Sequence, residues 1–196
     1  MELWTTISWL LVRASGFTAY LLLFLSVITG LALSSRWQSA AKWPRLINNE
    51  LHNFLTLLSL IFTTLHVLTA WIDPYAHFSW QEVFIPFATS YRTIGMAGGI
   101  LALYLGLSVG ISTWLRPLIG YQWWRRFHIV TFAVYLLALG HSIFTGTDSL
   151  TWWAISIYAV SAAMVGMLLV ARLSKKQQQA TGKVQHPVAT LQKQQS

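Results

Sequence analysis

The sequence predicts an all-α integral membrane protein whose core is a bundle of five transmembrane helices. Its 196 residues are 55% hydrophobic and only 9% charged, whereas soluble globular proteins carry about 25% charged residues. Apolar stretches of about 20 residues, the length that crosses the hydrocarbon core, recur along the chain. The composition therefore excludes an ordinary soluble domain. The absence of Cys also excludes disulfides, iron–sulfur clusters and thiolate zinc sites.

Each expected span is an apolar run between polar or charged segments. The first is expected from Ser15 to Leu33, and the apolar residues 4–12 before it are expected to lie in the membrane interface and lead into a tilted helix. The chain start lacks the basic region and cleavage site of a signal peptide. The other spans are expected at residues 51–72, 93–115, 127–145 and 152–171.

The chain therefore divides into a membrane domain and a short tail. Residues 1–171 form the expected transmembrane domain, and residues 172–196 are rich in Gln and Lys with few apolar residues. A segment of this composition cannot bury enough apolar surface to pack. We expect it to be a disordered, basic cytoplasmic tail.

The basic residues are distributed unevenly between the two sides of the expected bundle. Only Arg13 and Arg92 fall on the side of the N-terminus, and every other Lys and Arg falls on the opposite side. By the positive-inside rule, the N-terminus lies outside and the C-terminus in the cytoplasm, in a multi-pass protein of the cell (inner) membrane. The net charge of +8 is thus explained by topology and contact with the lipid bilayer. No nucleic-acid partner is expected.

Four of the six histidines lie within two of the expected spans. His52 and His66 belong to the second span, and His128 and His141 belong to the fourth. Ionisable residues inside a membrane are rare and usually mark functional sites. Fourteen residues of α-helix place His66 about 21 Å along the axis from His52 and on nearly the same face.

The direction of the spans pairs these histidines across the bundle. The second and fourth spans run the same way, so His52 is level with His128 near the cytoplasmic side, and His66 is level with His141 near the outer side. Two planar cofactors, each between two imidazoles, fit this arrangement, and haem b is the candidate because His is a common axial ligand. The 13-residue separation in the fourth span leaves its histidines about 140° apart on an ideal helix. We expect this span to tighten or bend, with Gly140 permitting it.

Two glycines of the first span repeat the histidine spacing. Gly16 and Gly30 are also 14 residues apart, at the outer and inner depths. Glycine lets a flat group such as a porphyrin approach the backbone closely. Packing between helices through small residues explains the same spacing, so both interpretations stay open.

Four arginines flank the two expected haem levels. Arg125 and Arg126 precede His128 on the inner side, and Arg13 and Arg92 are the basic residues of the outer side. Guanidinium groups form charge-assisted hydrogen bonds with carboxylates such as haem propionates. We expect these arginines to contact propionates or, on the outer side, an anionic acceptor, although Arg125 and Arg126 are also explained by topology alone.

Several short motifs lie near the histidines and elsewhere in the expected transmembrane domain. They are Arg-Ala-Ser-Gly at 13–16, Leu-His-Val-Leu-Thr-Ala at 65–70, Pro-Phe-Ala-Thr-Ser-Tyr-Arg at 86–92, Trp-Arg-Arg-Phe-His at 124–128 and Gly-Thr-Asp at 146–148. With the two histidine spacings, they resemble the ferric reductase-like transmembrane domain family, the bis-haem core shared with NADPH oxidases, and small bacterial stand-alone members in particular. The resemblance covers roughly residues 10–171. The chain also resembles the haem subunit of periplasmic methionine-sulfoxide reductase systems, which generally lacks the complete set of four histidines.

The resemblance implies the cofactors and their ligands. His52 and His128 would be the axial ligands of an inner haem b, and His66 and His141 those of an outer haem b, with no separate catalytic residue. Eukaryotic members continue into a flavin and NADPH domain, for which residues 172–196 are too few, so no flavin is expected in this chain. The implied protein is an oxidoreductase subunit. It would pass electrons from a cytoplasmic flavoprotein reductase or a quinol to ferric iron, oxygen or a partner protein outside.

Two other functions are compatible with membrane histidines. A haem-free transporter of divalent metals could use the imidazoles to bind zinc, but transporters usually place their sites near the midplane beside carboxylates or broken helices. The histidines here lie at two depths, without a carboxylate in mid-span. A haem-based sensor would keep both haems but would not transfer electrons.

Overall fold

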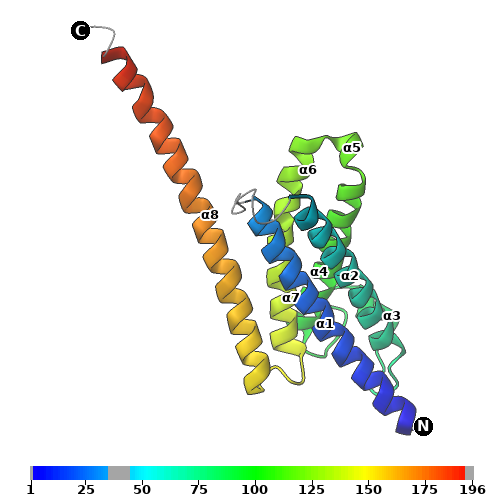
Figure 1. Ribbon diagram of the computed structural model, residues 1–196. Helices are drawn as coiled ribbons and strands as arrows, with labels where there is room; N and C mark the ends of the chain where they lie inside the picture. The colour runs from blue at the N-terminus through cyan, green and yellow to red at the C-terminus, as the bar shows by residue number, and fades with distance from the viewer. Residues whose placement is uncertain (1, 35–44, 193–196) are drawn as a thin grey trace.

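The computed structural model describes residues 2–34 and 45–192, and all regular elements in this part of the chain are helices (Figure 1). Five of the helical segments described are long and apolar enough to cross a membrane, which confirms the expected all-α bundle. The long helices are α1 (Glu2–Ser34), α2 (Arg45–Ile72), α4 (Thr93–Trp114), α7 (Thr131–Thr145) and α8 (Trp152–Gln192). Shorter elements are α3 (Trp80–Phe84), α5 (Arg116–Ile119), α6 (Tyr121–Phe127) and the 3₁₀ turn η1 (His128–Val130).

The helices at the two ends of the chain are longer than expected. α1 includes residues 4–12 in one continuous helix with the first span. The buried Ser15 hydroxyl donates to the Leu11 carbonyl and so has a partner within its own helix. α8 continues to Gln192 and so includes most of residues 172–196. That this segment is a separate disordered tail stays a prediction. The orientation also stays a prediction, because Arg36 and Lys42, on which it partly depends, lie outside the described residues.

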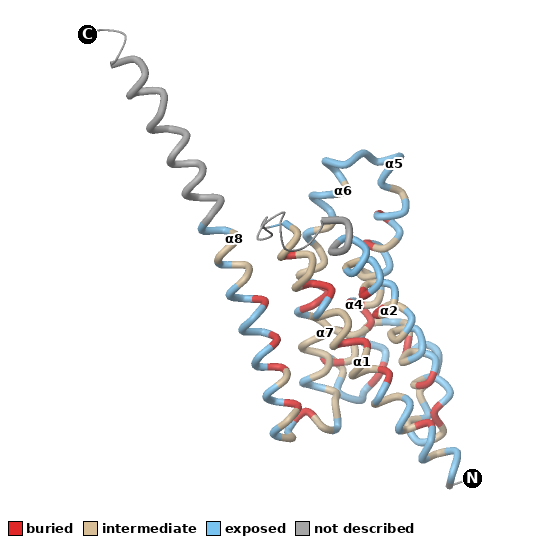
Figure 2. Tube along the Cα trace, viewed as in Figure 1, coloured by how far each residue is buried: buried red, intermediate tan, exposed pale blue. Residues whose placement is uncertain are grey.

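The bundle consists of two helix pairs and one additional helix. α1 packs along α2, and α4 packs along α7. α8 lies against α1 and α7 on one side of the bundle and extends beyond it (Figure 1). The buried residues of α8 face the other helices (Figure 2). The loops place α5 and α6 at one end of the bundle and the N-terminus at the other.

The fourth membrane-spanning segment contains a tighter helical turn at its first histidine. α6, η1 and α7 follow one another, and η1 begins at His128, whereas Gly140 lies within regular α-helix. A 3₁₀ helix has 3.0 residues per turn and a rise of about 2.0 Å per residue. Three such residues therefore recover about 60° of the 140° difference and lengthen 13 residues to about 21 Å. This equals the axial distance that 14 α-helical residues give between His52 and His66.

Candidate functional site

All four membrane histidines face one another in the expected pairs. The rings of His52 and His128 have centroids 6.2 Å apart at an interplanar angle of 73°, and those of His66 and His141 are 6.1 Å apart at 74°. A bond from a metal to an imidazole nitrogen is about 2 Å long, so two imidazoles facing one metal ion have centroids about 6 Å apart. Each pair therefore has the separation that a single metal ion between the rings requires.

One large cavity connects the two histidine pairs. Its volume is about 1830 Å³, and all four histidines line it, together with residues of α1, α2, α4 and α7. Single small-molecule pockets have volumes of about 300–1,000 Å³, so the space suits two planar groups rather than one. Within residues 2–34 and 45–192, no group of three or more His, Cys, Asp or Glu could hold a metal ion.

Hydrogen bonds to the backbone hold three of the four imidazoles. Because a carbonyl oxygen only accepts, the Nδ1 atom in each of these bonds carries the proton, and Nε2 keeps a lone pair for a metal. The carbonyl also fixes the orientation of the ring. The bonds, each 2.9 Å long, run from His52 to Ser26, from His66 to Val12 and from His141 to Gly95.

A glycine four residues after each acceptor makes these bonds sterically accessible. In an α-helix, the carbonyl of residue i lies beside residue i+4, and here the i+4 residues are Gly16, Gly30 and Gly99. A Cβ atom at Gly16 would lie 2.7 Å from His66 Nδ1, and one at Gly99 would lie 2.5 Å from His141 Nδ1. At Gly30 the nearest ring atom, His52 Cε1, is 3.2 Å away. The glycines thus open the helix backbone to the imidazoles.

This arrangement gives two of the expected glycines an imidazole neighbour and adds two residues to the site. Gly16 and Gly30 have His66 and His52 as the nearest neighbours of a Cβ atom built there. That a porphyrin also approaches these two glycines stays a prediction. Gly95 and Gly99 together hold His141: the Gly95 carbonyl accepts its Nδ1–H, and Gly99 leaves room for its ring. Neither glycine was among the site residues expected from the sequence. Their depth in the membrane could have indicated this contact. The third and fourth spans are antiparallel, which brings both glycines level with His141.

A comparison with models of protein families identifies one family that the chain matches. The family model "Ferric reductase like transmembrane component" matches residues 15–139. The chain belongs to this family. The match contains three of the four paired histidines and ends two residues before His141. No curated protein and no solved structure matches the chain significantly. Membership indicates a role in membrane electron transfer, and ferric reductase-like domains in general bind haem.

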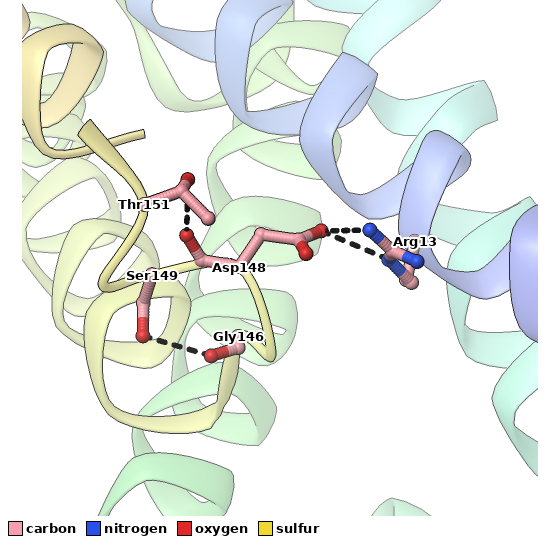
Figure 3. Close-up of polar contacts among 5 residues, drawn as sticks. All are labelled: Arg13, Gly146, Asp148, Ser149 and Thr151. Carbon is pink, nitrogen blue, oxygen red and sulfur yellow. Dashed lines mark hydrogen bonds and ion pairs between the residues drawn. The ribbon is translucent and has the colours of Figure 1, made fainter. Parts of the chain in front are cut away.

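Arg13 of this ferric reductase-like protein forms an ion pair. Its Nε donates to Asp148 Oδ2 over 2.9 Å, and its Nη2 bonds the same oxygen (Figure 3). The loop that carries Asp148 is held locally, since the Ser149 hydroxyl donates to the Gly146 carbonyl and the Thr151 hydroxyl donates to the Asp148 carbonyl. Both members of the ion pair line the large cavity. The charge of Arg13 therefore has a protein partner.

The other three expected arginines lie in different surroundings. Arg92 has a left-handed backbone conformation with φ of 42° and donates to the Phe144 carbonyl over 2.8 Å. Arg125 lines the large cavity, whereas Arg126 stacks over the Trp123 ring at 5.3 Å. Contacts of these arginines with propionates or with an anionic acceptor stay predictions.

Proposed function

We propose that this ferric reductase-like protein is a membrane cytochrome b that holds two haem b groups, one between His52 and His128 and the other between His66 and His141. The observation that carries the proposal is the repetition of the same ring separation, 6.2 and 6.1 Å, at two levels of one cavity. When bound, the haems supply one-electron transfer from a cytoplasmic flavoprotein or quinol to an outer acceptor, such as ferric iron, oxygen or a partner protein.

The protein's own groups prepare these sites in three ways. The carbonyls of Val12, Ser26 and Gly95 hold the Nδ1 protons of three imidazoles and leave Nε2 free as a ligand. The glycines let the rings lie against the backbone. The apolar helices surround the cavity and keep the sites in a medium of low polarity, which influences the redox potential of a bound metal centre.

The depth of the two histidine pairs supports transfer across the bilayer. About 21 Å along the helix axis separates the pairs, and the hydrocarbon core is about 30 Å thick. Each pair thus lies toward one face of the membrane. Two sites at these depths divide the crossing into shorter steps.

The ring geometry also bears on the metal-transporter alternative. Structural zinc has four protein ligands, and catalytic zinc has three with an open position, whereas each pair here supplies two facing imidazoles. Two facing imidazoles would complete the ligand set of a haem iron, because the porphyrin would supply the other ligands. We therefore favour haem over a bare divalent ion.

The haem content of the purified protein tests the proposal directly. The purified protein should show b-type bands in the dithionite-reduced minus oxidised spectrum and about two haems per chain. His66→Ala should remove about half of the haem, and His52→Ala with His66→Ala nearly all of it, because each pair loses one of two ligands. His77→Ala is the matched control, since His77 is exposed and does not line the cavity. A protein without haem, or a double variant that keeps both haems, would contradict the proposal.

A liposome experiment separates electron transfer from sensing. Liposomes that contain the protein and enclose ferricyanide should lose the enclosed oxidant when dithionite is added outside. His66→Ala liposomes should lose it far more slowly, because one of the two sites is empty. If the wild-type protein carries two haems but enclosed ferricyanide persists as in protein-free liposomes, the haems are not a transmembrane path and the sensor interpretation is favoured.

A further inference from the structure

His128 is the exception among the four paired histidines. Its Nδ1 atom is buried and has no hydrogen-bond partner in the part of the chain that the structure describes. The three other imidazoles each donate from Nδ1 to a backbone carbonyl. The site formed by His52 and His128 therefore has one supported ligand, and the site formed by His66 and His141 has two.

The helix spacing identifies the α4 carbonyl that would accept a hydrogen bond from His128 Nδ1. In α1 the two glycines that face histidines are 14 residues apart, and the residue 14 positions after Gly99 in α4 is Thr113. Because α4 is antiparallel to α7, Thr113 lies at the level of His128. The carbonyl four residues earlier is that of Val109. This carbonyl already accepts bonds from the Thr113 hydroxyl at 3.0 Å and from the Ser112 hydroxyl at 2.7 Å.

Trp124 connects this position to His128. Its Nε1 donates to the Thr113 hydroxyl over 3.1 Å, and its ring lies against the His128 imidazole, with centroids 4.9 Å apart and an interplanar angle of 35°. The guanidinium of Arg116 lies 5.4 Å from the same indole ring. Thr113 thus carries a Cβ atom at the position where each of the other three imidazoles has a glycine beside its accepting carbonyl. The Trp124 indole lies against His128 in a tilted orientation.

We propose that Thr113 and Trp124 are positioning residues for His128 and make the two haem sites unequal. Trp124 orients the imidazole through its tilted ring contact, and the Cβ atom of Thr113 keeps the Val109 carbonyl from its Nδ1. The inference rests on the proposed haem binding. A hydrogen bond from Nδ1 to a carbonyl makes an imidazole a stronger donor to its metal, and a stronger donor favours the oxidised metal. His128 lacks this bond. The midpoint potential of the haem at the α5–α6 end is therefore higher than it would be if His128 also donated to a carbonyl.

The decisive variant is Thr113→Gly, which recreates the glycine of the other sites. In the haem-loaded protein, we expect one of the two midpoint potentials to fall while the other stays, and haem loss from that site to slow by about tenfold. Thr113→Val is the matched control, because it removes the hydroxyl but keeps the Cβ atom, and it should leave the potential near that of the wild type. If Thr113→Gly moves neither potential, or if Thr113→Val produces the same fall, the inference is wrong.

A second measurement does not depend on haem. In protein prepared without haem and labelled with ¹⁵N-histidine, NMR should show a hydrogen-bonded Nδ1–H for three of the membrane histidines in the wild type and for all four in Thr113→Gly. His128→Ala identifies the signal of the fourth. Four bonded signals already present in the wild type would overturn the inference. Absence of haem from the purified protein would instead contradict the proposed function and leave this readout valid.

Discussion

Alanine at Gly99 or Gly16 is expected to empty the haem site proposed between His66 and His141. A Cβ atom at Gly99 would lie 2.5 Å from His141 Nδ1, and one at Gly16 would lie 2.7 Å from His66 Nδ1, both closer than non-bonded atoms approach. The imidazole must move away and lose its carbonyl acceptor. Loss of such a supporting bond costs about 10–100-fold in metal affinity, and displacement of the ring adds to it. Either variant should purify with about one haem per chain.

The glycines provide a graded series with internal controls. Gly30→Ala should have a smaller effect, and on the other haem, because its Cβ atom would lie 3.2 Å from His52 Cε1. Gly98→Ala and Gly140→Ala should keep both haems, since neither glycine lines the large cavity. A Cβ atom at Gly98 would meet the Leu137 carbonyl at an ordinary distance of 3.6 Å, and one at Gly140 would meet no atom within 4 Å. Haem per chain after purification and the amplitude of the reduced-minus-oxidised bands measure the series. Equal haem contents for Gly99→Ala and Gly98→Ala would show that the glycines do not provide access to the carbonyls.

The bundle and the histidine pairing could be predicted because both depend on regular periods. The lengths of the apolar runs locate the spans, and the rise of an α-helix together with the direction of each span gives the depth of every histidine. His52 and His66 follow these rules without correction. The sequence predicts that the fourth span departs from an ideal α-helix, because a 13-residue separation cannot match a 14-residue one in length and face. Where the tighter turn lies, at His128, depends on local backbone geometry.

The roles of the glycines and arginines depend on neighbours that are distant in the sequence. The contact between Gly16 and His66 joins residues on two helices, and single-sequence spacing does not distinguish an imidazole from a porphyrin at that position. Arg13 pairs with Asp148, which lies 135 positions away. No local pattern indicates such a pair. The sequence therefore predicts which residues are candidates, while tertiary packing decides what each one contacts.

One buried hydroxyl contributes to the attachment of α8. Ser161 is fully buried, and its hydroxyl donates to the Tyr158 carbonyl over 3.0 Å. The same oxygen accepts from the Tyr135 hydroxyl of α7 over 3.1 Å and also bonds the Tyr20 hydroxyl of α1. Since the single Ser161 proton is used by Tyr158, both tyrosines donate to it. One serine thus connects α8 with two other helices.

Ser161→Ala is accordingly expected to destabilise the protein by about 2 kcal/mol, because two buried tyrosine hydroxyls lose their partner. Thermal unfolding in detergent measures the loss of stability. Hydrogen exchange should increase mainly in α8. Ser156→Ala is the matched control on the same helix, since Ser156 is exposed and its hydroxyl bonds only the Trp152 carbonyl of its own helix. Equal stabilities of the two variants would contradict the prediction. Haem content should stay the same in both, because α8 carries none of the four paired histidines, so a parallel loss of haem would mean that α8 supports the haem sites directly.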